Sequence, residues 1–427
     1  MICLVEALRY RCLKYIKKDI GNFHILVGPN ASGKSTLLDV ISFLGDVVKN
    51  GPESAVRKRT PNYNDLFWLR EGDSFELAVE MKIPDKYENE GKCRYEITIG
   101  KIEETGELGI LSETLWFIPK YSECLNKNSE RYDTSSIHPK QTIVNRPELS
   151  WIKMINKIKN GKDEFYPEKK VTFTVGKLFE GFISGGSATI SYSFKLGPQK
   201  SALGNLPEDE TKFPVAIWFK KMLMDGIQTL ILNSEKMRNS SPPGMPRQFS
   251  TEGSNLPWVI ERLKTEYPQR FYNWIEHVKT ALPELKTVKT LIREDLQHRY
   301  LVVVYKDNLE VPSWMVSDGT LRLLALTILA YLPDIEGTLL IEEPENGIHP
   351  GAIETIFQSL SSVYNAQVLV ATHSPEIVNV AGIKDILCFV KTEDGVVDIV
   401  SGKNHPNLTQ WKGETPLSIL FASGVLG

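Results

Sequence analysis

The segment Gly28-Pro29-Asn30-Ala31-Ser32-Gly33-Lys34-Ser35 constrains the fold of this chain more than any other. It fits the pattern G-x-x-x-x-G-K-[ST], in which a glycine-rich loop wraps around nucleotide phosphates. Glycine lets successive backbone N–H groups turn toward an anion without a side chain in the way. We therefore expect this loop and Thr36 to bind phosphates, with Lys34 at the β- and γ-phosphates and the Ser35 hydroxyl at Mg²⁺.

The flanks of the loop fit a strand and a helix. Phe23-His24-Ile25-Leu26-Val27 is an apolar run that is typical of a buried strand. Apolar residues then recur at helical spacing, at Leu37, Leu38, Ile41 and Leu44. A helix that begins at the loop adds its positive dipole end to the phosphate site. These flanks favour a phosphate-binding loop over a chance glycine-rich turn.

Length and composition limit the class of protein. With 427 residues we expect two or three lobes, and 41% hydrophobic and 24% charged residues indicate a globular chain. A net charge of −3 argues against strong attraction to nucleic acid over the whole surface. Five scattered cysteines without C-x-x-C spacing predict neither a disulfide framework nor a zinc site. We expect no membrane span and no signal peptide, and hence a cytoplasmic protein.

Two adjacent carboxylates follow a second apolar run, residues 338–341. An α/β sheet delivers side chains at strand ends, where ligands bind, so Glu342 and Glu343 fit such a position. A phosphate site with Mg²⁺ needs one carboxylate for the metal and another for the attacking water. We assign the metal to Glu342, together with Ser35, and the water to Glu343. An acidic surface turn is the alternative.

Two further elements carry candidate site residues. His373 follows the apolar run 366–372 and could touch the γ-phosphate, although a histidine after a strand is more often a structural hydrogen-bonding group. Ser317-Asp318-Gly319 reads as a helix start with Ser317 or Asp318 as the N-cap. The helix that starts here either is a capped core helix or receives an anion at its N-terminus. If another protomer supplied the anion, the same helix could do both.

In this order, the four elements resemble an ABC-type ATPase head of the SMC/RecF/OLD-like branch of AAA proteins. Residues 28–35 match Walker A, and residues 339–343 match Walker B with its catalytic glutamate. His373 matches the switch histidine, and residues 345–349 resemble the D-loop. Residues 317–320 resemble the signature motif in the short form that this branch uses.

The resemblance implies a fold and a mechanism. The fold class is α/β, a P-loop NTPase with an ABC-type mixed sheet, an antiparallel β-subdomain and a mixed α+β insertion. Such heads form homodimers in which ATP and Mg²⁺ lie between Walker A of one subunit and the signature helix of the other, here at Ser317 and Gly319. Two departures stand out: Glu342 replaces the usual Asp, and residues 61–68 contain no glutamine for the Q-loop.

The remaining sequence divides into three expected parts, residues 1–118, 119–285 and 286–427. Strand-like stretches in residues 1–10 and 74–118 suit the antiparallel β-subdomain. The insertion mixes helical patterns at 214–227, 258–266 and 270–282 with strand patterns at 171–175 and 188–194. It has no sustained heptads, which argues against long coiled-coil arms. Arg238 within it could reach a phosphate or the other protomer. Basic residues near Trp151 suggest either a nucleic-acid contact or, as we favour, a solvated face: Lys153, Lys157, Lys159, Lys162, Lys169 and Lys170.

The sequence supports two main functional hypotheses. In the first, an ATP-hydrolysing dimer controls a separate effector, as in the Septu-like anti-phage modules with a nuclease partner that this branch resembles. In the second, a RecF-like repair ATPase binds DNA directly. A transporter subunit fits less well because of the length of the insertion and the non-transporter signature. A non-catalytic scaffold fits less well because Lys34 and Glu343 are both present. Residues 374–427 are too short for the Toprim nuclease domain of OLD-type proteins, so we expect any nuclease activity to come from another polypeptide.

Overall fold

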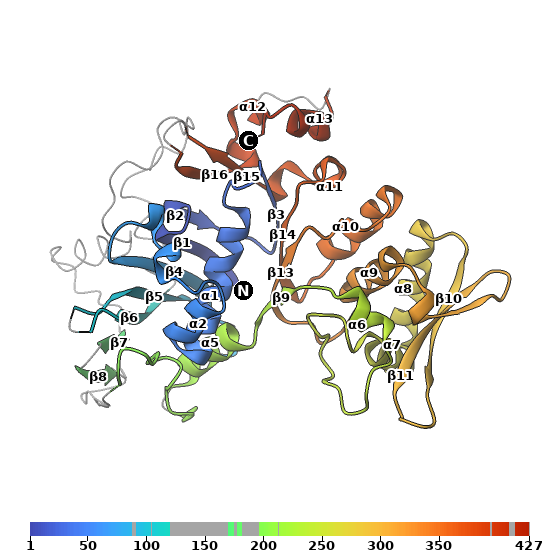
Figure 1. The fold of residues 1–427 in the computed structure, drawn as a ribbon, viewed down its shortest axis with the longest axis horizontal. Helices are drawn as coiled ribbons and strands as arrows, with labels where there is room; N and C mark the ends of the chain where they lie inside the picture. Colours follow the sequence, from blue (N-terminus) through green and yellow to red (C-terminus); the bar gives the residue numbers. More distant parts are fainter. Residues whose placement is uncertain are drawn as a thin grey trace.

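The computed structural model describes residues 1–87, 91–103, 105–119, 170–174, 177–181, 196–211, 213–392, 395–409 and 415–426. Two large sheets occupy the left and centre of Figure 1, and a small sheet with several helices occupies the right. Most of the basic residues near Trp151 and the strand pattern at 188–194 lie outside the described residues. No helix within the described ranges is long and apolar enough to cross a membrane.

A six-stranded sheet forms the centre of the molecule, in the order β16-β15-β3-β14-β13-β9. Its strands are β3 (Phe23–Val27), β9 (Ile227–Leu230), β13 (Gly337–Glu342), β14 (Ala366–Ala371), β15 (Ile386–Lys391) and β16 (Val397–Ser401). All neighbours are parallel except β15 and β16. The register pairs Glu342 with Ala371 and Ala371 with Leu26, so β13, β14 and β3 end at the same level.

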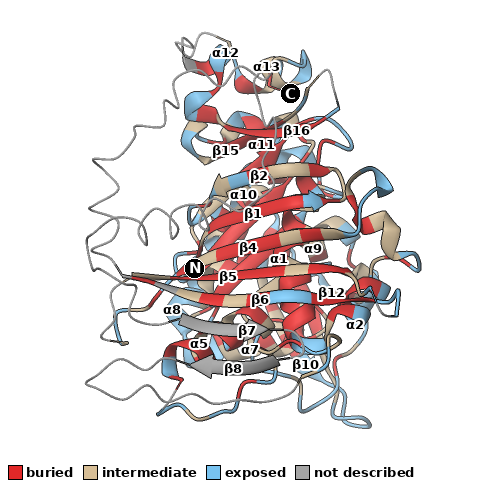
Figure 2. Cartoon of the chain, turned by 90° about the vertical axis from the view of Figure 1, so that its left-hand side faces the viewer, coloured by how far each residue is buried: buried red, intermediate tan, exposed pale blue. Residues whose placement is uncertain are grey.

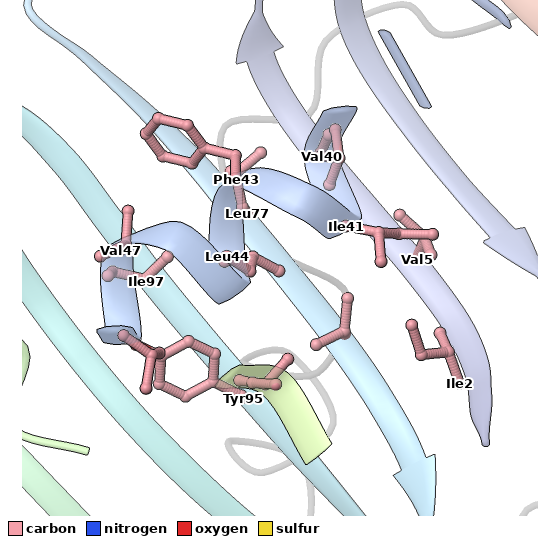
Figure 3. Packing of buried hydrophobic residues seen from close by; sticks show 14 of the residues in the cluster. Ile2, Val5, Val40, Ile41, Phe43, Leu44, Val47, Leu77, Tyr95 and Ile97 are labelled. Carbon is pink, nitrogen blue, oxygen red and sulfur yellow. The ribbon is translucent and has the colours of Figure 1, made fainter. Parts of the chain in front are cut away.

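A seven-stranded antiparallel sheet lies on the other side of helix α1 (Lys34–Asn50) and fills the view in Figure 2. Its order is β2-β1-β4-β5-β6-β7-β8. The strands are β1 (Ile2–Tyr10), β2 (Leu13–Asp19), β4 (Ser74–Lys82), β5 (Gly91–Lys101), β6 (Leu108–Pro119), β7 (Lys170–Thr174) and β8 (Lys177–Gly181). Figure 3 shows Phe43 and Leu44 of α1 packed beside Leu77 and Ile97 of the sheet. This packing holds the helix that begins at the glycine-rich loop.

Helices surround the two larger sheets and the small sheet β10-β11-β12. They are α2 (Pro52–Arg57), α5 (Pro214–Met224), α6 (Ser234–Arg238), α7 (Leu256–Glu266), α8 (Pro268–Ala281), α9 (Asp318–Thr327), α10 (Ile353–Ser361), α11 (Pro375–Val380), α12 (Pro406–Thr409) and α13 (Leu417–Ala422). The small sheet consists of β10 (Leu285–Ile292), β11 (Arg299–Tyr305) and β12 (Glu310–Pro312). Short 3-10 turns include η1 (Tyr63–Leu66), η2 (Trp68–Arg70), η5 (Ser313–Met315), η6 (Ile328–Tyr331), η7 (Pro350–Ala352), η8 (Ile383–Asp385) and η9 (Gly402–Asn404).

The central sheet separates two hydrophobic cores, because successive side chains of a strand point to opposite faces. Leu340 of β13 packs into the first core with α1, whereas its neighbours Leu339 and Ile341 pack into the second core. The second core also contains the buried sides of α7, α8, α9 and α10. Both faces of β13 are therefore buried, as its unbroken apolar sequence predicts.

The structure confirms the predicted α/β class, the mixed sheet and the antiparallel subdomain. Helical windows predicted at 258–266 and 270–282 correspond to α7 and α8. The helical window 214–227 is wrong at its end, because α5 stops at Met224 and β9 begins at Ile227. Although β9 falls within the expected insertion 119–285, it is a strand of the central sheet. The three-part division of the chain stays a prediction.

The basic triplet Arg57-Lys58-Arg59 is neutralised by carboxylates rather than displayed as a free patch. Arg57 pairs with Glu53, and Lys58 pairs with Asp46. Arg59 contacts both Asp39 and Asp46, and its side chain is almost fully buried. Arg59 therefore forms part of the packing around α1, whereas Arg57 and Lys58 are exposed but paired with carboxylates, so the triplet offers little free positive charge to nucleic acid.

Gln367 on β14 ties the central sheet to the first strand of the antiparallel sheet. Its side chain is fully buried. The Oε1 atom accepts from Ile2 N at 3.2 Å and from the Thr338 hydroxyl at 3.0 Å. The Nε2 atom donates to Ile2 O at 2.7 Å and to Gly21 O at 2.6 Å. One amide thus satisfies four buried or half-buried polar groups from distant parts of the chain.

We expect Gln367→Leu to lower the free energy of unfolding by roughly 2–5 kcal/mol, because it leaves several buried backbone groups without partners. Gln358→Leu is the control, since Gln358 is exposed on α10 and its amide donates to the Glu354 side chain rather than to a buried backbone group. That change should stay within about 0.5 kcal/mol of the wild type. Urea unfolding followed by circular dichroism measures both, and equal midpoints for the two variants would refute the assignment.

Candidate functional site

The glycine-rich loop lies between β3 and α1, as the sequence predicts. Gly28 and Gly33 have φ angles of 149° and 100°, which favour glycine. A Cβ atom on Gly28 would lie 2.4 Å from the carbonyl oxygen of Phe389 on β15. The backbone at the start of the loop is therefore packed too closely against the sheet to accept a side chain.

Lys34 and Ser32 test whether the loop fits a phosphate group. The Lys34 ammonium donates to the carbonyl oxygens of Gly28 and Pro29, at 2.8 Å each. Burial lowers the pKa of Lys34 to about 8, although the Glu343 and Glu342 carboxylates act in the opposite direction. The Ser32 hydroxyl is buried without a hydrogen-bond partner among the described residues. A phosphate in the loop would give both groups an anionic partner, so the loop fits this ligand.

Ser35 and Glu342 meet across the sheet edge. The Ser35 hydroxyl on the first turn of α1 donates to Glu342 Oε2 at 2.6 Å. The extra methylene of Glu342, compared with aspartate, therefore does not prevent contact with the loop. The described residues contain no group of three or more His, Cys, Asp and Glu side chains that could hold a metal. A hydroxyl and one carboxylate suit Mg²⁺, which usually completes its shell with water and substrate phosphates.

Glu343 turns out of β13 in a left-handed conformation with φ 47°, which is uncommon for a residue other than glycine. Its N–H donates to Ala371 O at 2.8 Å, which anchors the turn to β14. The Asn346 amide donates to one carboxylate oxygen, and His373 Nε2 lies 3.7 Å from the other. The side chains of His373 and Glu343 are 35% and 44% exposed, so both can reach solvent and substrate.

Glu345 links the turn after β13 to the turn after β14, a contact that the sequence did not indicate. Its Oε1 atom accepts from the Thr372 hydroxyl at 2.5 Å and from His373 N at 3.2 Å. The Thr372 hydroxyl also accepts from Ser374 N at 2.9 Å. Glu345 thereby fixes the backbone that carries His373. The resemblance of residues 345–349 to the D-loop drew attention to Glu345 but did not indicate this contact, which depends on both turns sharing the sheet edge.

Ser317 and Gly319 lie at the start of α9, away from the glycine-rich loop. Ser317 is the N-cap, and its hydroxyl accepts from Thr320 N at 3.2 Å. A Cβ atom on Gly319 would lie 2.6 Å from Gly347 O, so this helix start packs on the turn that follows Glu343. The buried side of α9 belongs to the second core and that of α1 to the first, and Figure 1 places the two helices on opposite sides of the central strands.

The structure therefore assembles one set of predicted site residues and leaves another apart. The loop, Ser35, Glu342, Glu343 and His373 share the carboxyl edge of the central sheet. Ser317 and Gly319 make no hydrogen bond or ion pair with the loop among the described residues.

An open pocket of about 490 Å³ lies beside the loop, and no sequence pattern predicted it. It reaches the loop through Cys12, whose thiol lies 3.2 Å from the Thr36 hydroxyl. Its walls come from the turn between β1 and β2 and from the segment that follows α2: Arg11, Cys12, Arg59, Thr60, Asp65, Leu66, Phe67, Leu69 and Arg70. Its volume suits a small ligand group such as a nucleoside.

The loop between β3 and α1 and the acidic end of β13 define a P-loop NTPase of the α/β class. A family model described as "AAA domain, putative AbiEii toxin, Type IV TA system" matches residues 23–379. The chain belongs to this AAA family, as the resemblance to AAA proteins predicted. No curated protein sequence matches the chain.

Solved structures of SMC heads match this chain at low sequence identity. An SMC head bound to the C-terminal winged-helix domain of ScpA is 14% identical, with a TM-score of 0.51 over 93% of this chain and 97% of that chain. The SMC head domain from Thermotoga maritima is 11% identical, with a TM-score of 0.42 over 94% and 98%. An SMC head bound to ScpA derived from Pyrococcus furiosus is 14% identical, with a TM-score of 0.44 over 93% and 95%. The first of these supports the predicted ABC-type ATPase head fold.

We expect Gly28→Ala to weaken nucleotide binding by at least about tenfold, because the new methyl group must displace the loop from Phe389. Gly197→Ala is the control, since Gly197 has open space around its Cα and no positive φ. Titration with a fluorescent nucleotide measures both. Wild-type affinity in Gly28→Ala would show that the loop does not bind the ligand.

Proposed function

We propose that this chain binds and hydrolyses ATP with Mg²⁺, and that two copies share each nucleotide. The observation that carries the proposal is the 2.6 Å contact between Ser35 of the loop and Glu342, with Glu343 as the next residue. A phosphate site, a metal site and a basic carboxylate then lie together at one sheet edge. Family membership supports the same reading.

Each residue of the site has a separate task in hydrolysis. The loop amides, Lys34 and the free Ser32 hydroxyl bind the phosphates, and the pocket beside Cys12 receives the nucleoside. Ser35 and Glu342 would hold Mg²⁺, which neutralises developing phosphate charge when it is bound. Glu343 accepts a proton from the attacking water.

The residues around Glu343 orient it for that task. The Asn346 amide holds one carboxylate oxygen, which leaves the other to face the water. His373 lies beside that second oxygen, and we assign it the contact with the terminal phosphate. The backbone N–H of His373 donates to Glu345 Oε1, and this hydrogen bond keeps His373 in place. This arrangement supports a catalytic site rather than a nucleotide-binding scaffold.

The separation of α9 from the loop supports a shared site. The first amides of a helix lack partners within the helix, and its dipole favours an anion there. The start of α9 is exposed, and among the described residues Ser317 hydrogen-bonds within its own helix rather than to the glycine-rich loop. A second copy can bring its bound triphosphate to Ser317 and Gly319, and the head-to-tail homodimer completes two such sites.

We further propose that ATP binding and hydrolysis switch this dimer between shapes that a separate effector reads. The effector is a nuclease or toxin in prokaryotic anti-phage defence, acting in the cytoplasm. The family description, which names a "Type IV TA system", supports a role alongside a second component. The SMC head that is bound to ScpA offers an example of this fold holding a partner protein.

Replacing the proposed base should separate binding from turnover. We expect Glu343→Gln to bind ATP normally but hydrolyse it about 10²–10⁴ times more slowly, because the amide cannot accept the proton. Glu354→Gln, on the exposed side of α10, is the matched control and should keep wild-type turnover. Phosphate release and ATP titration are the measurements. An unchanged rate in Glu343→Gln would assign the water to another residue.

Mixing two inactive variants should restore activity if the sites are shared. Lys34→Ala removes the phosphate half and Ser317→Arg blocks the α9 half, so each variant alone should be inactive. A mixed dimer still contains one intact site, made from Lys34 of one copy and Ser317 of the other. We expect an equal mixture to recover about a quarter of wild-type turnover, since random pairing makes half of the dimers mixed. A mixture that stays inactive would refute shared sites.

A further inference from the structure

Arg238 ties the start of α9 to the central sheet. It is the last residue of α6, which follows β9 and is capped by Asn233. Its guanidinium pairs with the Asp318 carboxylate and donates to Val316 O at 3.3 Å from both Nε and Nη2. Its own carbonyl accepts from the Ser313 hydroxyl at 2.7 Å. One residue thus holds both sides of Ser317.

Asp318 poses an electrostatic problem for the proposed shared site. It is the first residue of α9, and its side chain is 54% exposed. A carboxylate there stabilises the helix through the dipole but repels an arriving triphosphate. Because the Ser317 hydroxyl already accepts from Thr320 N, it does not neutralise this charge. The Arg238 guanidinium is the cation that contacts Asp318.

We infer that Arg238 is a positioning residue for the nucleotide of a second copy. By neutralising Asp318 and fixing Val316, it keeps the start of α9 receptive to a triphosphate that another protomer holds. The inference rests on the proposed shared site, and it adds that the Asp318 charge must be neutralised for the triphosphate to bind there. Arg238 acts through Asp318 and the α9 backbone, so removing the carboxylate should remove most of the need for the arginine.

The neighbourhood of Arg238 supports an effect on docking rather than on folding. The pair is partly exposed on both sides, at 34% and 54%, and such ion pairs contribute little to stability. The packing of α6 comes instead from Met237, which is 1% exposed in the second core. Substitutions at Arg238 and Asp318 should therefore leave the fold intact.

The test measures ATP-driven dimerisation by sedimentation in a Glu343→Gln parent, which we expect to consume the nucleotide only slowly. We expect Arg238→Gln to weaken dimerisation at least about tenfold, and Asp318→Asn to change it by less than about threefold. The double variant should recover to within about threefold of the parent. Arg247→Gln is the matched control, because Arg247 is exposed and pairs with Glu266 at the end of α7.

A second measurement separates dimerisation of two copies from nucleotide binding by the glycine-rich loop of one copy. Binding of a fluorescent ATP analogue to dilute monomers should be equal in all of these variants, and thermal melting should show that each is folded. Arg238→Lys keeps the charge and should retain more dimerisation than Arg238→Gln.

The outcomes distinguish this inference from the proposed function. A parent that stays monomeric with ATP would overturn the shared site and this inference together. A dimerising parent with an Arg238→Gln variant that behaves like Arg247→Gln would overturn the inference alone. A double variant that dimerises as weakly as Arg238→Gln would also overturn the inference, because the effect of losing Arg238 would then not depend on the Asp318 charge.

Discussion

The common ending of three parallel strands is the constraint on which the rest of the site depends. The register that aligns Leu26, Ala371 and Glu342 brings the loop after β3, the turn after β14 and the acidic end of β13 to one edge. Parallel strands share a direction, so each contributes its following turn to the same place. The Ser35–Glu342 hydrogen bond and the Glu343–His373 contact are consequences of that alignment.

The structural features that depend on local residue patterns can be predicted from the sequence. The loop follows from its glycines and Lys34, and the Ser317 cap follows from its position before an apolar helix. One error lies at the end of α5: Asp225 is the C-cap, and the chain leaves the helix at Gly226, where a Cβ atom would lie 2.7 Å from the Met222 carbonyl oxygen. The pattern of apolar residues alone predicted that the helix continues to Ile227, whereas α5 ends at Met224.

Contacts between distant segments could not be predicted from local patterns. Gln367 satisfies Ile2 at the other end of the chain, and nothing in its strand distinguishes it from a polar surface residue. The Arg238–Asp318 pair joins residues that are 80 positions apart in the chain. Glu345 is found only when both turns are placed in space. Such interactions depend on the three-dimensional register, which one sequence does not reveal.

The two cores on either side of β13 have a consequence for how related chains can change in length. Leu339 and Ile341 face one core and Leu340 faces the other. Inserting or deleting one residue within this strand would exchange its two faces and point Glu342 away from Ser35. The loops that surround each core carry no such restriction. Over evolution, insertions should therefore accumulate in the flanking segments while the six residues of β13 keep a fixed length.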